Sequence, residues 1–103
     1  MIRGTTPTIT MELPSEVSVA EIASAIVSIE QSGKEKITKT FPEITQDTGA
    51  NTLAVKLTQE ESLSLSSRNK AIVQLKVKTS NGTVLASHPT PMVVTDIINK
   101  EVM

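Results

Sequence analysis

Few residues in this 103-residue chain could carry out acid–base or nucleophilic chemistry, and they are isolated from one another. The chain has a single histidine, His88, between Ser87 and Pro89, and it has no cysteine. A hydrolytic triad needs a nucleophile, a base and an orienting acid, and no nucleophile-elbow pattern accompanies His88. A transition-metal site would need further His or Cys ligands. We therefore predict a non-enzymatic protein with no catalytic residue and no metal ligand, in which His88 faces solvent at a strand end rather than serving a function.

The acidic residues and the glycines also lack the spacing of familiar binding loops. The carboxylates do not follow the D-x-D-x-D-G pattern of an EF-hand, so at most they would bind calcium weakly from loops. The four glycines are scattered, and none belongs to a phosphate-cradling loop. We expect no cofactor and no small-molecule substrate. The carboxylates that fail to match the calcium-binding pattern are those of Asp47, Glu60, Glu61 and Asp96.

Charge and hydropathy argue against further classes of partner. Ten basic and eleven acidic side chains give a net charge of −1, which provides no basic field for a phosphate backbone. Phe41 is the only aromatic residue, so recognition by stacking is nearly excluded. The N-terminus lacks signal-peptide features, and no apolar run approaches the ~18 residues of a membrane span. We expect no nucleic-acid partner, no membrane association and no secretion by the usual route.

Alternation of apolar and polar residues predicts strands throughout the chain, about a third of which is β-branched. The clearest run, residues 70–79, alternates aliphatic residues with lysines and Gln74. We expect these lysines to be solvated and to guard a sheet edge rather than to bind anions. The lysines are Lys70, Lys76 and Lys78. The predicted strands cover residues 8–13, 25–31, 34–41, 53–57, 70–79, 83–86 and 92–98.

Residues 15–31 allow two interpretations. Ser18 and Glu21 match a capping box, and apolar residues at helical spacing follow them. From Ala25 onward, however, apolar and polar residues also alternate, and the run ends at Ser32-Gly33, a hairpin turn that leads to residues 34–41. We predict one helical turn over 18–23 followed by a strand.

Three other segments are expected to connect strands. Residues 42–51 are predicted to form a loop, since they contain Pro, Asp, Gly and Asn. Thr58 and Glu61 match a second capping box, which predicts a single helical turn that crosses between two sheets. Asn81-Gly82 predicts a two-residue type I′ hairpin, because both residues tolerate positive φ. Asn81-Gly82-Thr83 also matches an N-glycosylation acceptor pattern, which we interpret as a turn only.

About seven short strands in about 100 residues predict one all-β domain over residues 1–103, an immunoglobulin-like antiparallel β-sandwich with one or two short helical turns. The Cys and Trp residues that pin antibody domains are absent, so the likeness is one of architecture. Residues 1–7 form an N-terminal arm and residues 99–103 a frayed tail. The predicted core residues are Ile9, Met11, Leu13, Val27, Ile29, Leu53, Val55, Leu57, Ala71, Val73, Leu75 and Val77.

The arm and the start of the first strand are the candidate interface. An extended Thr-rich segment can add to the exposed edge of a sheet, and this would support binding to other protein subunits or self-association. The alternative is a disordered start that merely precedes the first strand. The candidate interface residues are Arg3, Gly4, Thr5, Thr6, Pro7 and Thr8.

The motif Arg3 to Thr8, followed by alternating residues up to Pro14, resembles the start of small proteins encoded in the tail regions of phages and prophages of Gram-positive gut bacteria. Residues 57–61 and 77–82 fit the same pattern, and the resemblance extends loosely over most of the chain. It implies a virion structural or assembly protein near the baseplate, similar in spirit to the N-terminal domain of baseplate upper proteins. Such a protein would be made in the bacterial cytoplasm and would contact phage tail proteins. Residues 16–23 depart from the family by being longer and more helical.

The alternative hypothesis is a bacterial cell-surface or adhesion-type immunoglobulin-like domain separated from a larger protein. Both hypotheses describe binding modules, and they differ in the partner. A signal sequence or flanking repeats in the gene would favour adhesion, whereas neighbouring tail genes would favour the virion.

Overall fold

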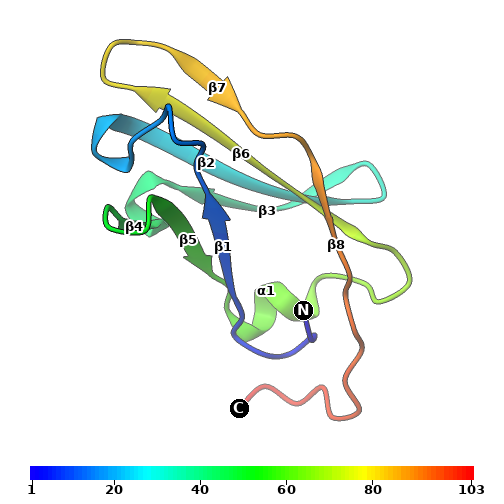
Figure 1. Ribbon diagram of the computed structural model, residues 1–103. Helices are drawn as coiled ribbons and strands as arrows, with labels where there is room; N and C mark the ends of the chain where they lie inside the picture. Colours follow the sequence, from blue (N-terminus) through cyan, green and yellow to red (C-terminus); the bar gives the residue numbers. More distant parts are fainter.

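Two antiparallel sheets face each other in the computed structural model, which describes all residues 1–103 (Figure 1). The smaller sheet has the strand order β1-β5-β4, and the larger has the order β3-β2-β6-β7, with β8 also paired to β6. This arrangement confirms the predicted β-sandwich. The strands are β1 (Thr8–Glu12), β2 (Ile22–Gln31), β3 (Lys34–Thr40), β4 (Thr45–Asp47), β5 (Thr52–Lys56), β6 (Ala71–Thr79), β7 (Val84–Ala86) and β8 (Thr90–Met92).

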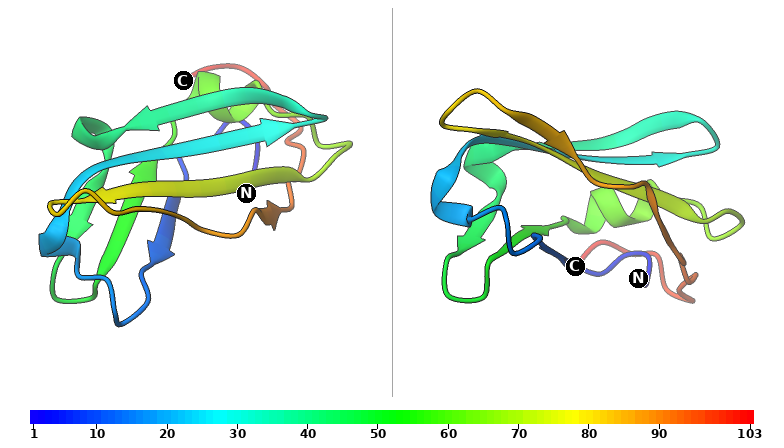
Figure 2. Two further views of the ribbon diagram at one scale, coloured as in Figure 1. Left: turned by 90° about the horizontal axis from the view of Figure 1, so that it is seen from above. Right: turned by 45° about the horizontal axis from the view of Figure 1, so that its top comes forward.

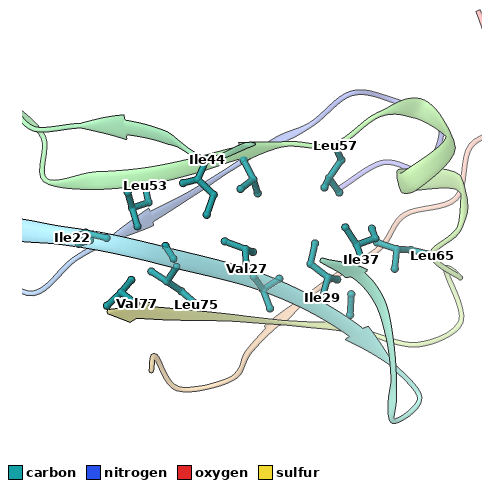
Figure 3. Packing of buried hydrophobic residues seen from close by; sticks show 14 of the residues in the cluster. Ile22, Val27, Ile29, Ile37, Ile44, Leu53, Leu57, Leu65, Leu75 and Val77 are labelled. Carbon is teal, nitrogen blue, oxygen red and sulfur yellow. The ribbon is translucent and has the colours of Figure 1, made fainter. Parts of the chain in front are cut away.

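The core lies between the sheets and is aliphatic (Figure 3). Strand β6 shows why: every second residue from Ala71 to Thr79 is buried, as the two-residue period of a strand requires. Of the twelve predicted core residues, nine are buried, while Ile9, Met11 and Leu13 are only partly buried. The buried cluster also contains residues outside that prediction, namely Val19, Ile22, Ala25, Ile37, Ile44, Leu65 and Val94.

The two short helical turns predicted from capping boxes are present. Ser18 caps the 3-10 turn η1 (Val19–Glu21) by accepting from the Ala20 N–H, and the chain then enters β2 directly. The strand interpretation of residues 25–31 is therefore confirmed. Thr58 caps helix α1 (Gln59–Leu63) through a complete capping box with Glu61. This helix lies between β5 of the smaller sheet and β6 of the larger one, as expected of a crossing connection.

The two predicted hairpin turns differ in type. Ser32 and Gly33 have φ values of 55° and 77°, so the β2–β3 hairpin has the two-residue type I′ geometry. The type I′ prediction for Asn81-Gly82 was wrong, because only Gly82 has positive φ. The Thr79 N–H donates to the Thr83 carbonyl at 2.9 Å, and this bond encloses a loop of three residues, 80–82, instead. Within the loop, the Gly82 N–H donates to the Thr79 carbonyl at 3.0 Å. Asn81 favours this loop because its side-chain oxygen accepts from the Thr79 hydroxyl and the Thr83 N–H.

Two other element predictions were wrong. Residues 42–51 are not all loop: the 3-10 turn η2 (Phe41–Glu43) and strand β4 occupy part of the segment. The last strand covers Thr90–Met92 rather than residues 92–98. Met92 pairs with Ala71, the first residue of β6, so the chain beyond Met92 has no strand beside it in this sheet.

The lysines of β6 are exposed, as predicted, but they do not guard an edge. Strand β6 is central, with β2 on one side and β7 and β8 on the other. Lys76 and Lys78 therefore cover the outer face of the sheet, and the edge-guarding role predicted for them was wrong.

Candidate interaction surface

The N-terminal arm is folded onto the domain (Figure 1). Ile2 forms a parallel bridge with Thr95, and the Arg3 N–H donates to the Thr95 carbonyl at 2.9 Å. The N-terminal ammonium group donates to the Val93 carbonyl at 3.0 Å. The segment after β8 thus runs beside the start of the arm and pairs with backbone groups of Met1 and Arg3.

Arg3 fastens the arm through its side chain. Its guanidinium group donates to a carboxylate oxygen of Asp96 and to the Leu63 carbonyl, both at 2.8 Å. The pKa of Asp96 is lowered, first by the Ile97 N–H that donates to its carboxylate and then by Arg3. Arg3 therefore connects three segments: the arm, the end of α1 and the C-terminal segment.

Ser62 of α1 is a second anchor. Its side chain is fully buried, its hydroxyl oxygen accepts from the Gly4 N–H at 2.9 Å, and the hydroxyl lies 2.7 Å from the Thr5 carbonyl. The Pro7 carbonyl accepts from the Leu57 N–H at 2.9 Å, and Thr8 then begins β1. The structure therefore places the arm against the domain, through Ser62 and Leu57 as well as Arg3. Contacts of the arm with another protein stay a prediction, and strand addition by Gly4 or Thr5 would first require detachment.

Sequence reasoning found the arm but not the residues that hold it. Ser62 and Asp96 lie 58 and 93 positions away from their partners in the arm. The capping box predicted the helical turn on which Ser62 lies, but no local pattern marks Ser62 or Asp96 as an anchor.

Strand β1 is one of the two edges of the smaller sheet and pairs only with β5. The Leu57 N–H bonds to the Pro7 carbonyl and the Leu13 N–H to the Asn51 carbonyl, so odd-numbered residues of β1 direct their backbone groups towards β5. Backbone groups alternate in direction along an antiparallel strand. Those of Thr8, Thr10 and Glu12 therefore point away from the sheet.

An apolar cleft lies between β1 and the opposite edge of the larger sheet. One part, of about 390 Å³, lies between Met11 of β1 and Met92 of β8, and a second, of about 140 Å³, extends to Leu85 of β7. Both parts share Leu75, Ser87 and Glu12 in their walls. The cleft explains why Leu85 is 41% exposed although it pairs with buried Val77. We call β1 and this cleft together the open flank.

The other sheet edges are poorer sites for strand addition. Strand β3 carries four charged residues among seven, and β4 and β7 have three residues each. Strand β8 contains Pro91, which has no N–H to donate. Charged side chains, a short strand and proline are the features by which proteins prevent an exposed edge from pairing with a strand of another chain. Strand β1 has five residues and contains no proline, glycine or lysine.

On the opposite flank of the sandwich, the chain passes from β3 through η2 to β4 (Figure 2). Lys39 of β3 is 8% exposed, and its ammonium group lies 2.8 Å from Glu61 of α1 and 3.7 Å from Glu43 of η2. Burial alone would raise the pKa of Glu61, but hydrogen bonds from Lys39 and from the Thr58 N–H outweigh it and lower the pKa. The two flanks therefore differ: ion pairs close one, while the other exposes an unpaired strand edge above apolar side chains.

No protein-family model and no curated protein matches this chain. No three His, Cys, Asp or Glu side chains are grouped as metal ligands would be, and no helix is long and apolar enough to cross a membrane. His88 is exposed in the connection between β7 and β8. The open flank is the feature that the geometry offers for recognition.

Proposed function

We propose that this protein is a non-enzymatic binding module that attaches to other proteins through the open flank. The observation that carries the proposal is the unpaired edge of β1 directly beside an apolar cleft. An extended segment of a partner can add to such an edge by backbone hydrogen bonds. The backbone groups of Thr8, Thr10 and Glu12 are available for this pairing.

The cleft supplies the specificity in this proposal. Alternate side chains of an added strand point to the same face, about 7 Å apart. Those on the inner face would enter the cleft and contact Met11, Leu75 and Leu85. A partner strand with apolar residues at every second position fits this surface best.

We further propose that the partners are phage tail proteins and that the protein is a structural or assembly component of a virion. The support is the resemblance of residues 3–14, 57–61 and 77–82 to small proteins of phage tail regions. Such a component needs no catalytic site, because its role is to hold subunits together.

Site-specific photo-crosslinking tests both parts of the proposal. A photoreactive residue replaces Thr10 on β1, and the matched control replaces exposed Lys36 on the edge strand β3. In assembling particles we expect cross-links from position 10 to other subunits, among them one or a few tail proteins, and none from position 36. Equal labelling from both positions, or none from position 10, would contradict a role for the open flank. Cross-links from position 10 to a cell-envelope protein instead would favour the adhesion hypothesis.

A further inference from the structure

The edge of β1 is complementary to itself. A two-fold axis through Thr10 would pair β1 with β1 of a second copy in antiparallel orientation, so that Thr10 faces Thr10 and Thr8 faces Glu12. This register joins all the outward backbone groups of Thr8, Thr10 and Glu12, and it leaves none of them unpaired. A shift of the axis to Glu12 would place two carboxylates opposite each other. Two copies would then share one six-stranded sheet.

The inner face agrees with the same register. Ile9 of one copy would lie opposite Met11 of the other, and both side chains are only partly buried in the isolated chain. Apolar cross-strand pairs of this kind stabilise antiparallel sheets. The pairing would thus cover apolar surface along the open flank of each copy.

The positions of two exposed charged residues, Glu12 and Lys56, favour a second copy of this chain over an unrelated strand as the partner of β1. Thr8 pairs with Lys56 of β5, so Lys56 lies one strand behind Thr8 on the exposed face. The two-fold register places Glu12 of the second copy directly beyond Thr8. Three neighbouring strands then carry a row of exposed residues: Lys56 and Thr8 of one copy, followed by Glu12 of the other. The two charged residues are separated by two strand spacings of about 4.8 Å each, a distance that Lys and Glu side chains can bridge. The symmetry produces this row twice.

Neither charged residue has an ion-pair partner within its own chain. The ion pairs of the molecule involve Arg3, Lys39 and Lys100, and neither Glu12 nor Lys56 takes part in one. Within one chain, Glu12 pairs with Thr52, four residues along β5 from Lys56, which is about 13 Å at 3.3 Å per residue. A contact between Glu12 and Lys56 therefore needs two copies.

We infer that two copies of this protein associate through antiparallel pairing of β1 about a two-fold axis at Thr10, with Glu12 of each copy two strands away from Lys56 of the other, in the same row of exposed residues. The inference rests on the proposed binding role of the open flank and names a second copy as the occupant of the β1 edge, while a tail protein would contact the apolar cleft beside that edge. A two-fold contact is closed, because the same patch is used on both copies, and it does not propagate into fibres.

Charge reversal tests this inference by sedimentation equilibrium. Glu12→Lys would place two ammonium groups in each row, and Lys56→Glu would place two carboxylates there, so we expect each variant to raise the dimer dissociation constant roughly ten-fold. An equimolar mixture of the two variants should restore association, as should the double variant Glu12→Lys/Lys56→Glu. Restoration cannot arise within one chain, since the two positions are too far apart there.

Two further variants serve as controls. Lys76→Glu makes the same charge change on the exposed face of a central strand and should leave association unchanged. Thr10→Pro removes an outward N–H from the centre of the edge and should abolish the dimer, while circular dichroism checks that the domain still folds.

A wild-type chain that stays monomeric up to about 1 mM would overturn the inference. The inference would also be overturned if the charge reversals at Glu12 and Lys56 left the dimer dissociation constant unchanged. The same holds if the equimolar mixture of the two variants did not associate more tightly than either variant alone. The photo-crosslinking above separates this failure from failure of the proposed function. If the chain is monomeric but position 10 still labels tail proteins, the binding role stands and the second copy is excluded.

Discussion

The ammonium group of Lys39 lies 2.8 Å from a carboxylate oxygen of Glu61, and this ion pair connects the edge strand of the larger sheet to the helix between the sheets. Lys39 lies on the same face of β3 as buried Ile37, so alternation directs it inward. A lysine is rarely buried without a partner. Glu61 supplies that partner while it also caps α1 through the Thr58 N–H.

This pair predicts a pH dependence of stability. The pKa of Glu61 is lowered in the folded protein, so its contribution is fully present above the pKa of the unfolded chain and is lost as pH falls through the folded value. The contribution should fade below about pH 4.3, the ordinary value for Glu. Glu61→Gln should therefore unfold at lower urea concentration than wild type at pH 7, with a difference that shrinks towards pH 3. The neighbouring exposed Glu60→Gln is the control, and a pH-independent Glu61→Gln difference would contradict the assignment.

Gln31 should be among the most sensitive polar residues. It is 3% exposed, and its amide group donates to the carbonyls of Ser66 and Asn69, at 2.6 and 2.9 Å, and accepts from the Ser66 N–H at 2.7 Å. Gln31→Leu would leave these backbone groups without a partner, at about 1 to 3 kcal/mol for each group that water cannot reach. We expect a loss of at least ~2 kcal/mol in urea denaturation. Gln74→Leu, which breaks one exposed hydrogen bond to Ser87, should cost under about 1 kcal/mol, and equal losses would refute the comparison.

Two core leucines should differ in sensitivity. Leu53→Ala and Leu75→Ala each create a cavity, which costs about 2 to 5 kcal/mol in such positions. Leu53 is 0% exposed, whereas Leu75 is 5% exposed and forms part of the wall of the apolar cleft. Space vacated at Leu75 adjoins solvent, so this variant should fall near the lower end of the range. An unchanged midpoint of denaturation for Leu75→Ala would sink its assignment to the core.

The two hairpin turns predict opposite responses to better turn residues. Ser32 has a φ of 55°, a conformation that asparagine tolerates better than serine, so Ser32→Asn should raise the free energy of unfolding by up to about 1 kcal/mol. Asn81 does not have positive φ, and its side chain accepts from the Thr83 N–H at 3.1 Å. Asn81→Gly should therefore lower stability by about 1 kcal/mol. Thermal denaturation of both variants checks this, and a gain from Asn81→Gly would restore the type I′ interpretation.

Arg3 should control how firmly the arm is held. Arg3→Ala removes the hydrogen bonds to Asp96 and Leu63, so the arm should open more often. We expect faster hydrogen exchange at the amides of Gly4 and Thr95, with little change at Val27 in the core. The control is Arg68→Ala, since Arg68 is exposed and makes no ion pair. Unaltered exchange at Gly4 would show that Ser62 and the backbone bonds to Thr95 hold the arm without the Arg3 side chain.

The sequence by itself determined the class of fold, because that depends on local periodicity. Alternation over residues 71–79 directs one side of β6 inward whatever strands lie beside it, and the structure confirms this pattern. The capping box at Thr58 likewise acts within four residues and forms α1 as predicted. Asn81 shows where the pattern of residue types was not sufficient. Its tolerance of positive φ predicted a type I′ turn, but the hydrogen bonds of its side chain stabilise a different loop.

Only the tertiary structure decided which edges are paired and which are open. The alternating residues of β1 do not reveal that this strand lies at the edge of its sheet. They also do not reveal that Leu75 and Met92 lie across a cleft from it. Lys39 and Arg3 look like ordinary surface residues in the sequence, and their partners Glu61 and Asp96 are 22 and 93 positions away. The periodicity of a strand fixes the direction in which each side chain points. The partner of that side chain depends on which distant segments the folded chain brings together. The binding role proposed for the open flank depends on that second kind of information.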